Sequence, residues 1–284
     1  MSTVAIIGAG ELGGACAQAL AARDRVRRVL MIDAAANAAA GKALDIQQSG
    51  AIDGFHSRII GSDDFTAVTG AAAIVVADRF GAPSAEWHGE EALAMLGRVL
   101  PYASGAPLVF AGAQQAVLMD LLRADLKVGP LNRDRLIGSA TEAYASAIRA
   151  IVALEAGCSP AEVMLAVLGA PPSFVVPWSE ASIGGYALDR VLSQVQITRI
   201  EARAARLWPP GPFTLGLAAA RIAEAIAASS RRMFSVLTLL GGEFGVRNRI
   251  GTLPVLISSQ GIASVRVPEL NTRERVQLEI ALGA

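Results

Sequence analysis

The sequence predicts an α/β protein with a doubly wound parallel sheet, followed by a second domain of mixed α/β type. Along residues 1–140, short apolar runs of strand type alternate with alanine-rich segments of helical spacing, which is typical of a parallel sheet covered by helices. After residue 140 the pattern changes to long helices and short strands without regular alternation. We therefore predict domains at residues 1–140 and 141–284, packed tightly because no low-complexity linker separates them.

A glycine-rich turn joins the first strand to the first helix. The β-branched run at residues 3–7 leads into Gly8, Gly10 and Gly13, the three glycines of a GxGxxG motif, and an alanine-rich helix follows. Gly8 permits a tight turn, Gly10 lets the backbone approach a pyrophosphate, and Gly13 allows the helix to pack on the strand. Free N–H groups at the helix N-terminus would bind the phosphates. The motif predicts a dinucleotide site of the Rossmann type, and an ordinary structural turn is the alternative.

Asp33 ends the second strand, at residues 29–33. A carboxylate at this place accepts hydrogen bonds from the adenosine ribose and repels a 2′-phosphate, so the sequence predicts NAD rather than NADP as the cofactor. We expect the cofactor to contact the turn and the neighbouring strand ends. The predicted contact residues are Gly8, Gly10, Glu11, Leu12, Gly13, Asp33 and Ala77.

The remaining segments of the first domain continue the alternation. In order, the patterns predict a helix at residues 34–46, strands at 58–60 and 71–77, a helix at 90–102, a strand at 108–111, a helix at 115–124 and a strand at 135–138. Polar, glycine- or proline-containing connections are predicted at residues 63–69, 78–89 and 129–130. In a doubly wound sheet the ligand crevice lies at the carboxyl ends of the strands.

The second domain begins with a helix at residues 141–156, which Gly157 ends. Its other predicted elements are strands at residues 163–168 and 174–176, helices at 188–207 and 214–229, strands at 233–239, 246–250 and 253–257, and a final helix at 271–282 with Asn271 as its N-cap. Prolines at 160, 171 and 172 and the run at 209–212 separate these elements.

Composition excludes several classes of partner. The chain carries 25 basic and 25 acidic residues without blocks of like charge, which argues against binding to nucleic acid or an anionic membrane. The hydrophobic content of 53% comes largely from alanine, and no uncharged run predicts a membrane span. No signal peptide is recognised, so we expect a cytoplasmic protein. Cys16 and Cys158 are expected to be buried, reduced thiols, and no metal-type spacing is found.

The order of these segments resembles the lactate/malate dehydrogenase family along almost the whole chain. The matching landmarks are residues 8–13, 41–46, 132–138, 167–169, 242–245 and 261–282. The resemblance implies an NAD-binding Rossmann domain followed by a mixed α/β substrate domain, assembled as a homodimer or homotetramer, with a small molecule as substrate. In that family a histidine held by an aspartate takes the hydroxyl proton of a 2-hydroxy acid, and arginines clamp the carboxylate of the acid.

This chain departs from the family pattern at the catalytic positions. Pro171 stands where the family has its histidine, and Tyr144 and Ala147 stand where it has the aspartate and an arginine. Ala113 replaces the substrate asparagine, and residues 81–89 contain no counterpart of the two loop arginines. Losing a positioned base costs about 10²–10⁴ in rate, and losing a charged clamp adds to that cost. We therefore expect no catalytic residue of the family type.

Three interpretations of function remain open. The first is an NAD-binding pseudoenzyme that has lost 2-hydroxy-acid chemistry. The second is an NAD-dependent oxidoreductase acting on a different, less polar CH–OH or carbonyl substrate, with Tyr144, His88 or an ordered water handling the proton. Helix capping is the alternative role of His88 and core packing that of Tyr144, while His56 is expected on the solvated surface. The third is a remnant kept for assembly alone, which the intact glycines and Asp33 argue against.

Overall fold

A parallel sheet forms the centre of the first half of the protein. A computed structural model describes residues 2–81, 86–124 and 132–283. Within it the parallel strands are β1 (Thr3–Ile7), β2 (Arg28–Ile32), β3 (Arg58–Ser62), β4 (Ala73–Val76), β5 (Leu108–Phe110) and β6 (Leu136–Gly138). They lie side by side in the order β3-β2-β1-β4-β5-β6. From β1 the chain adds strands first on one side, at β2 and β3, and then on the other, at β4, β5 and β6. The predicted fold class, a doubly wound parallel sheet, is confirmed.

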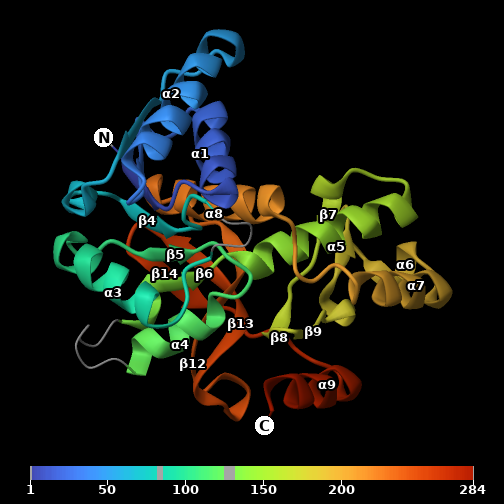
Figure 1. The fold of residues 1–284 in the computed structure, drawn as a ribbon. Coiled ribbons are helices and arrows are strands. Elements are labelled where there is room, and N and C mark those ends of the chain that lie inside the picture. The colour runs from blue at the N-terminus through green and yellow to red at the C-terminus, as the bar shows by residue number, and fades with distance from the viewer. Residues whose placement is uncertain (1, 82–85, 125–131, 284) are drawn as a thin grey trace.

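Helices cover both faces of this sheet. α1 (Glu11–Arg23), α2 (Ala36–Asp53) and α8 (Pro212–Ala227) lie on one face, and α3 (Gly89–Val99) and α4 (Ala116–Ala124) lie on the other (Figure 1). Along β1, Val4 and Ile6 pack into the first core, and Ala5 and Ile7 pack into the second. Because successive strand residues point to opposite faces, a strand covered on both sides must be apolar throughout. This burial explains the unbroken apolar run that precedes the glycine-rich turn.

The second half of the chain extends the same sheet with antiparallel strands. β12 (Met233–Gly241) pairs with β6 and with β13 (Arg247–Ser258), which also pairs with β8 (Leu168–Ala170) and β14 (Gly261–Val265). β9 (Ser173–Val175) follows beside β8, and β7 (Val163–Met164), β10 (Ser182–Ile183) and β11 (Tyr186–Ala187) form a separate small sheet. The main sheet is therefore continuous from one half to the other, and a domain boundary at residues 140–141 stays a prediction.

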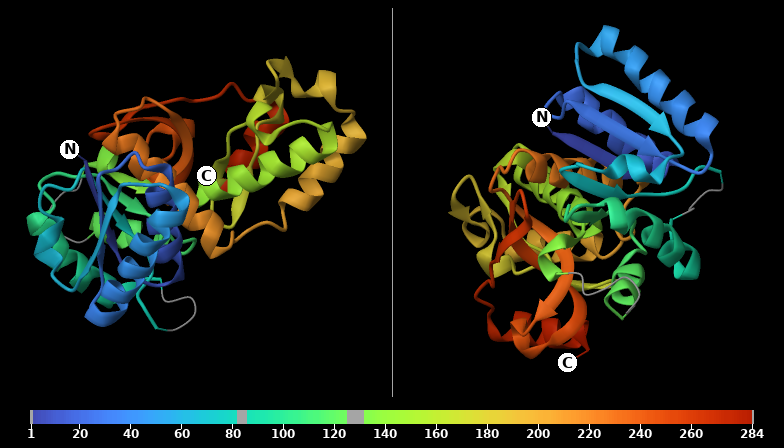
Figure 2. Two further views of the ribbon diagram at one scale, coloured as in Figure 1. Left: turned by 90° about the horizontal axis from the view of Figure 1, so that it is seen from above. Right: turned by 90° about the vertical axis from the view of Figure 1, so that its left-hand side faces the viewer.

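The helices that contribute to a third apolar core lie to one side of the parallel sheet (Figure 2). α5 (Ala140–Ala156), α6 (Leu188–Val191) and α7 (Gln194–Ala204) contribute to it, and α9 (Thr272–Leu282) packs against β9 near the C-terminus. Short 3-10 helices occur at Phe65–Val68, Leu100–Tyr102, Arg133–Arg135, Pro160–Glu162, Trp178–Glu180 and Glu243–Gly245. Among the described residues, no helix is both long and apolar enough to cross a membrane.

Capping residues decide where several helices begin and end. Asn271 is the N-cap of α9, as the sequence predicts, and it also forms a capping box with Glu274. The single helix predicted at residues 188–207 is wrong, because Ser193 caps a new helix with Gln196 and separates α6 from α7. The helix predicted at residues 34–46 is too short, since α2 continues to Asp53 before Gly54 ends it in the left-handed conformation.

Several other expectations need correction. The strands predicted at residues 246–250 and 253–257 are one strand, β13, whereas the strand predicted at 163–168 is divided between β7 and β8. β14 was not predicted. Cys16 is buried, but Cys158 is only half-buried. The turn predicted at residues 129–130 lies outside the described residues, as does part of the predicted loop at 78–89.

Candidate functional site

The glycine-rich turn lies at the carboxyl end of β1, where the backbone of the turn approaches its neighbours very closely. Gly8 has φ +114°, a left-handed conformation that favours glycine, and its N–H donates to the carbonyl of Ile32 at 2.7 Å. A Cβ atom on Gly13 would lie only 2.1 Å from the carbonyl oxygen of Gly8, so α1 packs on β1 only without a side chain there. α1 begins at Glu11. This backbone has the geometry that the sequence predicts for a phosphate turn.

The carboxylate of Asp78 occupies the position in front of this helix N-terminus. Its two oxygens accept hydrogen bonds from the N–H groups of Leu12 (3.2 Å) and Gly13 (2.9 Å). The carbonyl oxygen of Asp78 also accepts from the N–H of Gly10 at 3.0 Å. A Cβ atom on Gly10 would lie 2.3 Å from Cγ of Asp78, so the carboxylate fills the space over that glycine. The N–H groups predicted to bind phosphate therefore bind a side chain of the protein itself.

Asp33 also makes internal contacts at the end of β2. Its side chain is buried, and the carboxylate accepts hydrogen bonds from the N–H groups of Ala9 (2.8 Å), Ala35 (2.9 Å) and Phe80 (2.8 Å). Lys42 of α2 lies nearby, and its ammonium group donates to the carbonyl of Gly10 at 2.6 Å. Asp33 is thus next to the turn, as predicted, and its role in binding a ribose stays a prediction.

A third carboxylate, that of Glu86, lies at the carboxyl end of β5. It accepts from the N–H groups of Ala113 (3.0 Å) and Gln114 (2.9 Å), and burial together with the charge of Asp78 raises the pKa of Glu86. The side chain of Gln115 connects this end to β4 by donating to the carbonyl of Ala77 at 2.9 Å. The crevice edge predicted to bind NAD therefore has a suitable backbone but carries three carboxylates of its own.

Of the two positions that the resemblance assigns to the catalytic pair, that of Tyr144 lies in the third core. Tyr144 of α5 is buried, and its hydroxyl donates to the carbonyl oxygen of Ala204 at 3.2 Å. Its ring lies 4.9 Å from Phe174 and 5.9 Å from Trp208 between ring centroids. Burial raises the pKa of Tyr144, so the hydroxyl stays protonated. Pro171 follows β8, half-buried.

Charged groups near α5 are paired with each other. Glu142 is buried, accepts from the N–H of Ser235 at 2.9 Å and forms an ion pair with Arg149. Burial is the main cause that raises the pKa of Glu142, and Arg149 partly opposes it. Ala147 lies between them on the helix, half-buried. Arg149 is thus committed to a carboxylate of its own helix.

The two histidines lie on the surface. His88 stands at the N-cap position of α3, but its side chain makes no capping hydrogen bond. The residue is exposed, and its Nδ1 lies 2.8 Å from the carbonyl oxygen of Glu86. His56 is exposed, as expected, and lies beside the carboxylate of Asp24 at the far end of α1. Among the described residues, no group of three or more His, Cys, Asp or Glu side chains could hold a metal ion.

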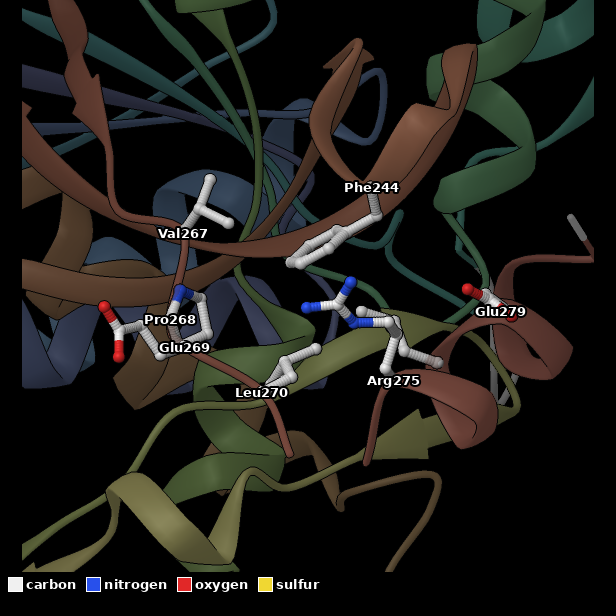
Figure 3. A pocket seen from close by; sticks show the side chains of 8 residues that line it. Phe244, Val267, Pro268, Glu269, Leu270, Arg275 and Glu279 are labelled. Carbon is white, nitrogen blue, oxygen red and sulfur yellow. The ribbon is translucent and has the colours of Figure 1, made fainter. Parts of the chain in front are cut away.

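A cavity of about 560 Å³ lies between the 3-10 helix Glu243–Gly245 and α9 (Figure 3). Val267 and Leu270 line it with apolar groups, and Arg275 projects into it beside Phe244. None of the described residues that line this cavity belongs to the predicted cofactor set or to the third core's aromatic cluster.

Sequence reasoning did not single out Asp78 or Glu86 as site residues. In the sequence, Asp78 is marked only by its place directly after an apolar run that predicts a buried strand. Its meaning depends on the pairing of β4 with β1, which places that acid beside the turn. Glu86 carries no comparable signal, because it reaches β5 from a connecting segment.

Comparison with known proteins places these features in a family context. Residues 2–88 match the family model described as lactate/malate dehydrogenase, NAD binding domain, which confirms NAD as the cofactor of this domain. The malate dehydrogenase of Thioalkalivibrio sulfidiphilus is 30% identical over 303 residues, covering 100% of this chain and 97% of the relative.

Two solved structures have the same fold. The malate dehydrogenase of Salinibacter ruber matches with a TM-score of 0.86 and 22% identity, covering 99% of this chain and 94% of that one. The lactate dehydrogenase of Cryptosporidium parvum, solved in complex with lactic acid and nicotinamide adenine dinucleotide, matches with a TM-score of 0.88, 22% identity and the same coverage.

Proposed function

Because this chain belongs to the lactate/malate dehydrogenase family, we propose that it is an NAD-binding member that has lost ordinary 2-hydroxy-acid dehydrogenase activity. One observation carries the proposal. Tyr144 stands at the position that the resemblance assigns to the family's aspartate, and its hydroxyl donates to the carbonyl of Ala204 inside an aromatic cluster. A protonated hydroxyl that already donates to a carbonyl cannot orient a proton-accepting imidazole.

The neighbouring positions support the same proposal. Pro171 has no titratable group, so it cannot take a hydroxyl proton. Ala147 offers no charge for a substrate carboxylate, and Arg149 forms an ion pair with Glu142. A missing base costs about 10²–10⁴ in rate, and one missing donor to a developing charge costs about 10²–10³. Because such losses are not additive within one catalytic unit, the family reaction is reduced at least by the factor of about 10²–10⁴ that the missing base costs.

The test is a turnover assay with the full chain. Protein is mixed with NADH and oxaloacetate or pyruvate, and with NAD and malate or lactate, while NADH absorbance is followed. The malate dehydrogenase of Thioalkalivibrio sulfidiphilus serves as the positive control. We expect no rate above that of the protein-free solution. Turnover at ordinary enzyme rates would contradict the proposal.

The cofactor half of the proposal has its own test. We expect NADH to bind more tightly than NADPH in calorimetry, because Asp33 repels a 2′-phosphate. Equal affinity for the two would contradict the assignment of Asp33. If neither NADH nor NADPH binds, the third interpretation is favoured, in which the protein is a family remnant kept for assembly alone. We also propose a homodimer or homotetramer in the cytoplasm, which light scattering and fractionation would test.

A second candidate is an oxidoreductase for a less polar CH–OH or carbonyl substrate. The aromatic cluster of Tyr144, Phe174 and Trp208 favours it, because such side chains would suit a substrate without a carboxylate. A panel of neutral ketones and aldehydes with NADH tests this candidate. It predicts a substrate whose reduction is abolished by Tyr144→Phe or by His88→Ala, whereas the first proposal predicts no such substrate.

A further inference from the structure

We propose that the segment Asp78–Phe80 is an internal occupant of the dinucleotide groove, which NAD must displace before its pyrophosphate can bind. The inference rests on the proposed role of the glycine-rich turn in NAD binding. It goes beyond that role by naming a residue, Asp78, that competes with the cofactor. The structural reason is that one short segment engages both parts of the groove, the turn and Asp33.

The first engagement is at the N-terminus of α1. An N–H group donates to one strong acceptor at a time, and those of Leu12 and Gly13 donate to the two oxygens of the Asp78 carboxylate. The same carboxylate lies over Gly10, whose lack of a side chain is the feature that would admit a pyrophosphate. A carboxylate and a phosphate are both anions with several acceptor oxygens. Asp78 therefore supplies to the turn what the cofactor would supply.

The second engagement is at Asp33. The N–H of Phe80 donates to Oδ2 of Asp33 at 2.8 Å, and the N–H of Ala9 in the turn donates to the same oxygen at 2.8 Å. The segment backbone thus connects to the carboxylate that is predicted to bind the ribose. Asp33 is only 3% exposed and Asp78 only 8% exposed, so both carboxylates are shielded from solvent in this structure.

Charge adds to the competition. A pyrophosphate placed at the turn would meet the carboxylate of Asp78 in a site shielded from water, where like charges repel strongly. Lys42 places a cation beside the turn, where its ammonium group donates to the carbonyl of Gly10. Binding therefore requires the carboxylate of Asp78 to leave the N–H groups of Leu12 and Gly13.

The segment is nevertheless held in a way that allows displacement. Asp78 forms a β-bridge with Glu86, and Arg79 lies over the Trp87 ring. Phe80 is 52% exposed, so its ring adds little apolar anchoring. Arg79 forms an ion pair with Glu91 on the exposed start of α3. A ligand whose oxygens accept from the N–H groups of Gly10, Leu12 and Gly13 replaces the hydrogen bonds that Asp78 makes to the turn, and it can thus release the segment without opening either apolar core.

Calorimetric titration of the full chain with NADH tests the inference. Asp78→Ala removes the competing carboxylate, and we expect it to tighten NADH binding about tenfold or more. Asp78→Asn keeps the size and removes the charge, so we expect tightening in the same direction. Asp24→Asn is the matched control, since Asp24 also accepts backbone N–H groups, those of His56 and Ser57, but at the opposite end of α1. Its NADH affinity should equal that of the wild type.

A second readout is thermal unfolding with and without NADH. Without NADH, Asp78→Ala should melt below the wild type, because two helix N–H groups lose their acceptor. Saturating NADH should stabilise this variant more than the wild type. If Asp78→Ala does not fold, the titration of Asp78→Asn carries the test.

Three results would overturn the inference. Equal NADH affinity for the wild type and both Asp78 variants would overturn it and leave NAD binding standing. Weaker binding by the variants would mean that the carboxylate assists the cofactor. Absence of binding to every variant would overturn it together with the proposed cofactor role.

Discussion

Replacing Tyr144 with phenylalanine separates a structural hydroxyl from a catalytic one. The substitution keeps the ring that packs against Phe174 and Trp208 and removes only the group that donates to the carbonyl of Ala204. If the hydroxyl is structural, stability falls and cofactor binding does not change. If the hydroxyl handles a proton, activity on the true substrate disappears.

The expected magnitude follows from the hydrogen bonds at Ala204. Its carbonyl oxygen also accepts from the N–H of Leu207 at 2.9 Å, so Tyr144→Phe does not leave it without a partner. The loss is then that of one ordinary hydrogen bond, about 0.5–1.5 kcal/mol. For a chain of this size that lowers Tm by about 2 °C. The aromatic contacts remain and contribute nothing to the difference.

Differential scanning calorimetry measures this shift, and NADH titration accompanies it. The matched control is Tyr186→Phe, since Tyr186 is 67% exposed and its Tm should stay within about 1 °C of the wild type. An unchanged Tm for Tyr144→Phe would refute the hydrogen bond to Ala204. Loss of a reaction that the wild type performs would refute the structural role and favour the second candidate function.

Two further predictions concern stability. Gly13→Ala should lower Tm by several degrees, because its Cβ would lie 2.1 Å from the carbonyl oxygen of Gly8. Gly41→Ala is the control: Gly41 lies in α2 with nothing within 4 Å of a Cβ, so this substitution should raise the free energy of unfolding by about 0.5–1 kcal/mol. A Tm of Gly13→Ala at or above that of the wild type would contradict the close approach of Gly13 to Gly8. Burial raises the pKa of Glu142 above its ordinary value of 4.5. The stability that this protonated side chain contributes is therefore complete below pH 4.5 and is lost as the pH rises through the raised pKa. Glu142→Gln lacks this titration, so its Tm relative to wild type should rise as the pH increases above the ordinary pKa of 4.5, and a constant difference would count against a raised pKa.

Local signals predicted much of the fold. The turn at Gly8 and the N-cap at Asn271 depend on residues adjacent in sequence, and both are where the patterns indicate. Long-range pairing decided where the strand predictions failed. Gly251 and Pro254 interrupt the strand pattern, yet both lie within β13 because β12 pairs with them at Thr238 and Ser235.

The site was predictable only in part for the same reason. The glycine motif and Asp33 are recognisable within one βαβ unit of sequence. Asp78 becomes a ligand of the turn only because β4 pairs with β1 and ends beside it. Tyr144 meets Phe174 and Trp208 from three distant segments, so no spacing in the sequence announces that cluster.

The most direct measurement is the rate at which the Asp78→Ala variant, saturated with NADH, reduces oxaloacetate. This variant removes the competing carboxylate while leaving every position around Tyr144 and Pro171 unchanged. We predict that NADH is bound and that its absorbance falls no faster than in solution without protein. Oxaloacetate reduction at the rate of an ordinary malate dehydrogenase would show that the catalytic groups are present after all.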